Sequence, residues 1–167
     1  MKKIVSGIIA ALLFLGCSSD KASEQNIEPK IVIGKSLVNL GLKNQFDKAE
    51  KLSSDTKKII ISYSKDTGHT CSGFFEKQTP TYLDDKNIKY LADISSAPSI
   101  IRSMFVIPGL QELKYSVLIL DDETIAAPYK AGVSIEKILV VSLNNNSITD
   151  IKTATTEDEL KQILESN

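Results

Sequence analysis

The sequence KKIIISYSKDTGHTC, residues 57–71, carries the strongest structural signal in the chain. Three consecutive isoleucines followed by Tyr63 are typical of a central strand that is buried on both faces. The polar residues 65–68 end this strand, and we predict that a helix begins near Thr70 and Cys71. A buried strand that leads into a helix favours an α/β fold.

The rest of the chain repeats this alternation. Apolar runs predict strands at residues 88–94, 116–120 and 137–143. Alternating apolar residues predict a half-buried strand at 38–42, and a short apolar run at 31–33 is closed by Gly34. Residues 45–48 are predicted to form a turn. Pro80 must kink or split the helix that follows the first buried strand, and residues 98–105 predict a further helix closed by Pro108 and Gly109.

The end of the chain predicts a hairpin and a helix. Four turn-forming residues, 144–147, separate the strand at 137–143 from a returning strand at 148–152. Thr156 and Glu159 form a capping box, and an apolar stripe follows them in the last helix.

Composition excludes several classes of protein. The chain has 167 residues, of which 42% are hydrophobic, enough for one domain with its own core. Twenty basic residues against 21 acidic ones give a net charge of −1, so no basic surplus favours nucleic-acid binding. Two cysteines and one histidine exclude a disulfide framework, a cysteine-only zinc site and any site with two histidines.

The amino terminus has the pattern of a targeting segment. Lys2 and Lys3 precede thirteen residues without charge, 4–16, which is shorter than the roughly 20 residues of a spanning helix. Gly16 and Cys17 end this run and resemble the lipobox of bacterial lipoproteins, although Phe14 stands where leucine is more usual. An ordinary secretory signal or a short anchor helix remains the alternative.

The lipoprotein resemblance implies three segments: a signal peptide at residues 1–16, a lipid-attached flexible tether at 17–30 and a domain at 31–167. It implies that Cys17 carries the lipid, including a palmitate-like acyl chain, and that the domain faces the periplasm. Ser18 after the cysteine favours the outer membrane if the source is Gram-negative. The expected partners are the membrane, through this lipid, and a protein of the envelope.

The order of elements, together with GHTC at residues 68–71, resembles the thioredoxin fold. In that family the junction between the buried strand and the helix carries Cys-x-x-Cys; Cys71 matches the second cysteine and Gly68 replaces the first. The pattern is most similar to the YtfJ-like, peroxiredoxin-related periplasmic branch, whose role is poorly defined. The resemblance implies a central mixed β-sheet flanked by helices, with a C-terminal hairpin and helix.

Two departures from the family bear on chemistry. Without a first cysteine, the domain cannot form a dithiol–disulfide pair. The family usually places a cis-proline before its hairpin strand, but residues 133–136 contain no proline. Both departures favour a binding or accessory module, with the loops around Thr67, Gly68, Thr70 and Ile135 offered to a partner.

The alternative is a single-cysteine thiol enzyme of monothiol or peroxidase-like type. A helix N-terminus would stabilise the Cys71 thiolate, and His69 would modulate it. The opposing interpretation is a relic cysteine that packs as a small hydrophobe. Asp66, His69 and Cys71 offer only three metal ligands, so we expect no metal, and no phosphate-binding loop indicates a nucleotide cofactor.

Overall fold

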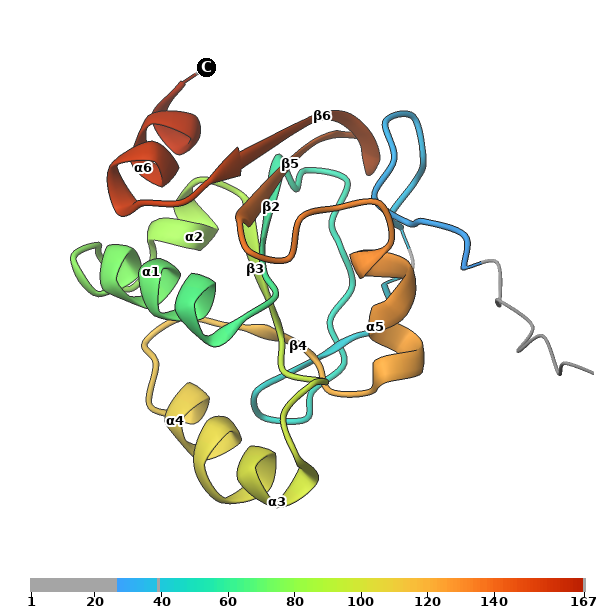
Figure 1. The fold of residues 1–167 in the computed structure, drawn as a ribbon. Helices are drawn as coiled ribbons and strands as arrows, with labels where there is room; N and C mark the ends of the chain where they lie inside the picture. The colour runs from blue at the N-terminus through green and yellow to red at the C-terminus, as the bar shows by residue number, and fades with distance from the viewer. Residues whose placement is uncertain (1–26, 39, 167) are drawn as a thin grey trace, which may run out of the picture.

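The structure is a computed structural model that describes residues 27–38 and 40–166. The predicted signal peptide, the lipidation site Cys17 and most of the predicted tether lie outside these residues. Figure 1 shows a β-sheet with helices on both of its faces. The predicted α/β architecture with a central mixed sheet is confirmed.

The sheet has six strands in the order β1-β4-β3-β2-β5-β6. Their bounds are β1 Lys43–Asn44, β2 Lys58–Ser62, β3 Ile88–Asp93, β4 Leu118–Leu120, β5 Ile138–Asn144 and β6 Ser147–Ala154. Strands β2, β3 and β4 are parallel, whereas β5, β6 and β1 pair with their neighbours in antiparallel fashion. The sheet is therefore mixed, and its C-terminal hairpin forms one edge.

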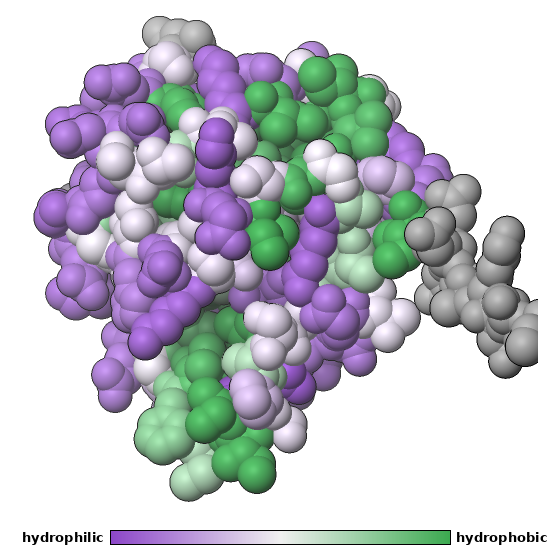
Figure 2. All heavy atoms as spheres, viewed as in Figure 1, coloured by the Kyte–Doolittle hydropathy of each residue, from purple (hydrophilic) through white to green (hydrophobic). Residues whose placement is uncertain are grey.

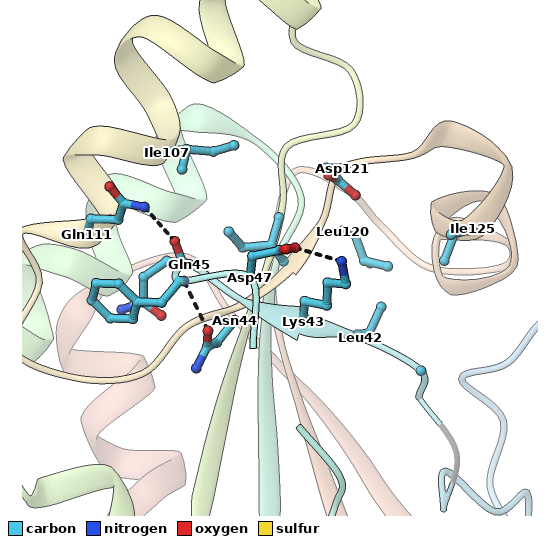
Figure 3. A pocket seen from close by; sticks show the side chains of 13 residues that line it. Leu42, Lys43, Asn44, Gln45, Asp47, Ile107, Gln111, Leu120, Asp121 and Ile125 are labelled. Atoms are coloured by element: carbon cyan, nitrogen blue, oxygen red, sulfur yellow. Dashed lines mark hydrogen bonds and ion pairs between the residues drawn. The ribbon is translucent and has the colours of Figure 1, made fainter. Parts of the chain in front are cut away.

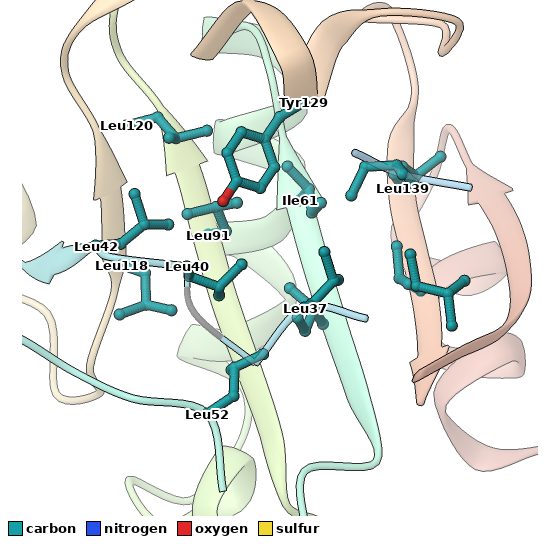
Figure 4. Packing of buried hydrophobic residues seen from close by; sticks show 14 of the residues in the cluster. Leu37, Leu40, Leu42, Leu52, Ile61, Leu91, Leu118, Leu120, Tyr129 and Leu139 are labelled. Atoms are coloured by element: carbon teal, nitrogen blue, oxygen red, sulfur yellow. The ribbon is translucent and has the colours of Figure 1, made fainter. Parts of the chain in front are cut away.

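Strand β2 lies inside the sheet because both of its faces are apolar. Ile59 and Ile61 point to one core, and Ile60 points to the other, as the two-residue period of a strand requires. The first core lies between the sheet, helix α5 (Glu123–Lys130) and the chain before β1; Figure 4 shows Tyr129 and Leu91 packed there. The second core lies under helices α1 (Lys65–Glu76) and α6 (Glu157–Glu165).

The helices are α1 Lys65–Glu76, α2 Tyr82–Asp85, α3 Ser99–Ile101, α4 Ile107–Gln111, α5 Glu123–Lys130 and α6 Glu157–Glu165. Pro80 lies between α1 and α2, as predicted. Helix α6 begins after the predicted cap, since the Thr156 hydroxyl accepts a hydrogen bond from the Glu159 amide at 3.2 Å. None of the helices in the described part of the chain is long and apolar enough to cross a bilayer.

Helix α1 begins earlier than the sequence predicted. The prediction placed its start near Thr70 and Cys71, but its first residue is Lys65 and its cap is Ser64. The Ser64 side chain accepts from the Thr67 amide, and the Thr67 hydroxyl accepts from the Ser64 amide. This reciprocal capping fixes the helix start directly after β2.

A loop replaces the strand predicted at residues 38–42. Residues 38 and 40–42 form no strand, and the short strand that pairs with β4 is β1 instead. Ile31, Leu37, Leu40 and Leu42 nevertheless lie in the first core. The apolar pattern therefore predicted correctly that these side chains are buried, but the prediction that residues 38–42 form a strand of the sheet was wrong.

A continuous helical segment replaces the single helix predicted at residues 98–105. Helix α3 runs into a π-helical turn, η1 Arg102–Val106, and then into α4. Pro108 lies inside this segment and does not end it. A proline has no N–H for the carbonyl four residues earlier, and wider π turns are one way in which helices accommodate an interrupted ladder.

The carboxyl end of the predicted tether belongs to the folded domain. The Lys30 amide donates to the Pro128 carbonyl at 2.8 Å, and its ammonium lies 4.5 Å from the centre of the Tyr129 ring. Lys35 pairs with Glu28 and also donates to the Pro29 carbonyl. The domain thus includes residues before the predicted boundary at residue 31.

Candidate binding groove

A groove of about 510 Å³ lies beside the start of α1, at the carboxyl ends of β2 and β3. Helix α1 forms one wall and the segment α3–η1–α4 forms the other. In open parallel sheets, ligands commonly bind outside the carboxyl ends of the strands. The residues that line it are Ser62, Tyr63, Ser64, Lys65, Gly68, His69, Ser72, Tyr90, Ala92, Asp93, Ile94, Ser96, Ala97, Ile101, Phe105, Val106 and Leu110.

The two walls of the groove differ in chemistry. The α1 wall carries Lys65, His69 and Ser72, which are polar, whereas the opposite wall carries Ile101 and Phe105. Figure 2 shows hydrophobic side chains gathered over α3 and α4 at the lower end of the molecule. A ligand in the groove would meet an apolar surface on one side and polar groups on the other.

Hydroxyl groups form the floor of the groove. The Ser62 hydroxyl and the Tyr90 hydroxyl lie 2.9 Å apart and share a hydrogen bond. The Tyr63 side chain lies in the first core instead, where its hydroxyl donates to the Tyr129 carbonyl at 2.8 Å. Burial raises the pKa of Tyr63 and of Tyr90 far above the ordinary tyrosine value, so both phenols stay neutral.

A buried ion pair closes the floor on the α5 side. Asp93 at the end of β3 has a fully buried side chain, and its Oδ2 lies 3.0 Å from the Lys130 Nζ. Lys130 also donates to Glu123 and to the Ser95 hydroxyl. Burial lowers the pKa of Lys130, but the carboxylates of Glu123 and Asp93 outweigh it and raise the pKa overall. The Lys130 ammonium therefore lies in an ion pair with the buried Asp93 side chain.

Cys71 lies in the second turn of α1, not at its start. Its side chain is fully buried in the second core, on the helical stripe that also carries Thr67, Phe74 and Phe75. Burial raises the pKa of the Cys71 thiol to about 12, although a hydrogen bond with Tyr90 opposes this. The predicted stabilisation of a thiolate by the helix N-terminus is therefore corrected: the thiol faces the core and stays protonated.

His69 and Cys71 lie on different faces of α1. Residues two apart on a helix do not face each other, and His69 is exposed while Cys71 is buried. The structure thus separates the predicted thiol and its predicted modulator. Within residues 27–38 and 40–166, no group of three His, Cys, Asp or Glu side chains is arranged to hold a metal ion.

The predicted binding residues fall in different places. Gly68 lines the groove, together with His69. Thr67 is buried and caps α1, while the Thr70 hydroxyl donates to the Asp66 carbonyl on the helix surface. Ile135 is exposed in the loop between α5 and β5 and is not among the lining residues.

A second pocket of about 400 Å³ lies where β1, α4 and α5 approach one another (Figure 3). The Gln111 side chain donates to the Gln45 carbonyl at 2.9 Å across it. The buried Gln45 amide donates to the Tyr115 carbonyl and accepts from the Val117 amide. These hydrogen bonds of Gln45 and Gln111 hold β1 against β4 and α4, so we assign the polar groups of this pocket a structural role.

The sequence signals for the groove were present only in part. The pair Ser64 and Thr67 is spaced as an N-cap and its N3 residue, which could have moved the predicted helix start. Asp93 ends a predicted strand, but nothing in the sequence indicated its partner Lys130, 37 positions later. The apolar wall was missed because exposed and buried helical stripes have the same spacing.

The sequence matches no known protein-family model and no curated protein. Solved structures are similar in fold. One is described as a "putative protein disulfide isomerase" from Bacteroides thetaiotaomicron, with 14% identity, a TM-score of 0.53 and coverage of 83% of this chain and 89% of the other. Another is described as a "putative thioredoxin" from Neisseria meningitidis, with 15% identity, a TM-score of 0.51 and the same coverages. The fold of this chain is therefore thioredoxin-like, as the sequence predicted.

Proposed function

We propose that this chain is an envelope-anchored, thioredoxin-like binding module that works without dithiol chemistry. Its groove would hold an apolar side chain and the adjoining backbone of a protein partner. The observation that carries the proposal is that hydroxyl and apolar groups contribute much of the lining of the groove at the start of α1, while the single cysteine of the described residues is fully buried and is not among the lining residues.

The groove has the properties that a peptide site needs. Ile101 and Phe105 offer apolar area on one wall, and the hydroxyls of Ser62 and Tyr90 are placed on its floor. The α3 wall is fixed by Arg102, whose guanidinium donates to the Ser95 and Ala97 carbonyls. A rigid site loses less conformational entropy on binding, so the same contacts give higher affinity.

The alternative, a single-cysteine thiol enzyme that uses Cys71, has no support in the geometry. An attacking thiol must reach its substrate and must ionise, but the Cys71 side chain is fully buried and its pKa is raised. His69 lies on another face of α1. A relic cysteine that packs as a small hydrophobe accounts for both observations.

The anchor belongs to the proposal because the lipobox lies outside the described residues. We expect Cys17 to be acylated and the domain to face the periplasm, with the outer membrane favoured by Ser18 if the source is Gram-negative. Mass spectrometry of the purified protein should show an acylated cysteine at the new amino terminus. Cys17→Ser should move the protein from the detergent phase to the aqueous phase; partition that does not change would contradict the anchor.

Two assays test the groove. Dithiothreitol-dependent reduction of insulin should not be accelerated by the protein, and appreciable turnover would overturn the proposal. Peptides selected on the wild-type protein from a random display library should bind about tenfold more weakly to Phe105→Ala. Ile135→Ala is the matched control, because Ile135 is also exposed but lies outside the groove. Equal losses in both variants would show that the groove is not the site.

A further inference from the structure

The segment α3–η1 has a second apolar side that lies outside the groove. Ile100 and Met104 are four residues apart and are 67% and 63% exposed. Neither lines the groove, whereas the next residues along the chain, Ile101 and Phe105, do. Residues four apart share one face of a helix. One helix therefore presents one apolar stripe to the groove and another, the outer stripe Ile100 and Met104, to solvent.

The segment that carries the outer stripe is almost free of charge. Residues 94–111 include one charged side chain, Arg102, whereas charged residues make up 25% of the chain. The guanidinium of Arg102 is held by two backbone carbonyls of its own loop. No carboxylate from this segment would have to be desolvated, or brought close to anionic lipid, if the outer stripe entered an apolar phase.

The size of the outer stripe argues against a stable protein interface. Ile and Met are smaller than the aromatic side chains, which bury about 150–250 Å² each, so the outer stripe offers a few hundred Å² at most. Each partner of a stable protein pair buries about 800 Å². A membrane interface sets no such minimum when a second attachment already holds the protein there.

The chain outside the described residues supplies that second attachment. The proposed lipid site, Cys17, precedes the first described residue, Ile27, by ten residues. Ten residues span at most about 35 Å, which is close to the diameter of a domain of this size. The lipid therefore keeps the domain within about one diameter of the bilayer, and the local concentration of its surface near lipid is high. The outer stripe then selects which face docks.

We propose that Ile100 and Met104 insert into the headgroup boundary of the leaflet that holds the lipid on Cys17. This inference rests on the proposed anchoring. The groove would then open beside the membrane surface, because its apolar wall is the same helical segment. A partner segment close to the bilayer would then reach the groove by diffusion along the membrane surface, without diffusing through the periplasm.

The test uses the absence of tryptophan from the chain. Met104→Trp gives a single fluorophore in the outer stripe, and Ile33→Trp is the matched control because Ile33 is also 63% exposed. Ile33 precedes Gly34, whose amide donates to the Ile148 carbonyl beside the β5–β6 turn, and Figure 1 places this loop far from α3. The chain that begins at Cys17 is coupled through its thiol to a maleimide lipid, in vesicles of phosphatidylethanolamine with a minority of phosphatidylglycerol.

We expect the emission of Met104→Trp to move to shorter wavelength and to be quenched by lipids brominated along the acyl chain. Ile33→Trp should show neither change. Quenching of both or neither variant, or of Ile33→Trp alone, would overturn the docking proposal. A shift that depends on protein concentration without vesicles would indicate a second copy instead. Because the lipid is attached chemically, a negative result bears on docking, while mass spectrometry of the cellular protein bears on the anchor.

Discussion

The first and second turns of α1 carry different chemistry within eight residues. The first turn presents the hydroxyls of Ser64 and Thr67, which lie 3.1 Å apart and cap the helix beside the groove. The second turn presents the thiol of Cys71, which lies in the core. The same strand–helix junction that holds Cys-x-x-Cys in the thioredoxin family thus holds hydroxyls at its helix start here.

This difference shows how strongly one capping residue decides the role of a cysteine. If α1 began at Thr70, Cys71 would lie among free N–H groups that stabilise a thiolate. Because Ser64 starts the helix six residues before Thr70, Cys71 is turned onto the buried stripe. The environment around the sulfur, rather than its presence in the sequence, determines its reactivity.

The largest expected effect is on the labelling of Cys71. In Cys17→Ser, Cys71 is the remaining thiol, and we expect it to react with iodoacetamide at pH 8 at least about a thousandfold more slowly in the native protein than in denaturant. The raised pKa leaves little thiolate, and the full burial of the side chain blocks access. Ser103→Cys in a Cys17→Ser, Cys71→Ala background provides an exposed control. If the alkylation rates of Cys71 in the native and the denatured protein were within tenfold of each other, the thiol would not be buried, and the contrast between the first and second turns of α1 would be wrong.

The next effect is a loss of stability at alkaline pH. The folded thiol keeps its proton to about pH 12, whereas an unfolded thiol releases it above about 8.5. The unfolded state then binds fewer protons, so the free energy of unfolding falls as pH rises between these values. From this group alone we expect a loss of about 1.4 kcal/mol between pH 7 and about pH 9.5.

Urea titrations at the two pH values measure this loss. Cys71→Ala should lower the free energy of unfolding at pH 7 but should reduce its change with pH by the same amount of about 1.4 kcal/mol. An unchanged pH dependence in the variant would mean that the Cys71 thiol already ionises near its free value.

Removing the cap of the first turn should have a smaller effect. Ser64→Ala leaves the Thr67 amide without its acceptor, and we expect a loss of about 1 kcal/mol in the free energy of unfolding. Thr156→Ala removes the equivalent cap of α6 and is the matched control with a similar loss. If only the α6 variant were destabilised, the early start of α1 would lose its explanation.

The smallest effect comes from moving the thiol to the first turn. Ser64→Cys in the Cys17→Ser, Cys71→Ala background places the single sulfur at the N-cap. The helix dipole should lower its pKa by about half a unit below 8.5. The pH dependence of its alkylation rate gives this pKa, and a value at or above 8.5 would show that the helix start does not favour a thiolate.

The sequence predicted the sheet well because its signals are local. The isoleucine run of β2, the apolar runs of β3 to β5 and the Thr156 capping box each contain enough information by themselves. Helix α5 was not predicted, although the Asp122 carboxylate accepts from the Thr124 and Ile125 amides as a helix cap.

The groove depends on contacts between distant segments. The pairing of Asp93 with Lys130 and the approach of α3–η1–α4 to α1 exist only in the folded chain. The exposure of Ile100 and Met104 is also a tertiary result, because their four-residue spacing is the same as that of a buried stripe. The positions of Gly68 and His69 in the groove could be derived from the strand–helix junction.

The most direct test of the account is the ionisation of Cys71, followed by thiolate absorbance near 240 nm in the folded Cys17→Ser protein. Tyrosine ionisation also absorbs at this wavelength, so Cys17→Ser, Cys71→Ala provides the baseline to subtract. The account predicts no thiolate signal through pH 9.5 and a midpoint that approaches 12. A midpoint at or below 8.5 would contradict it, because the sulfur would then lie in an environment that supports thiol chemistry.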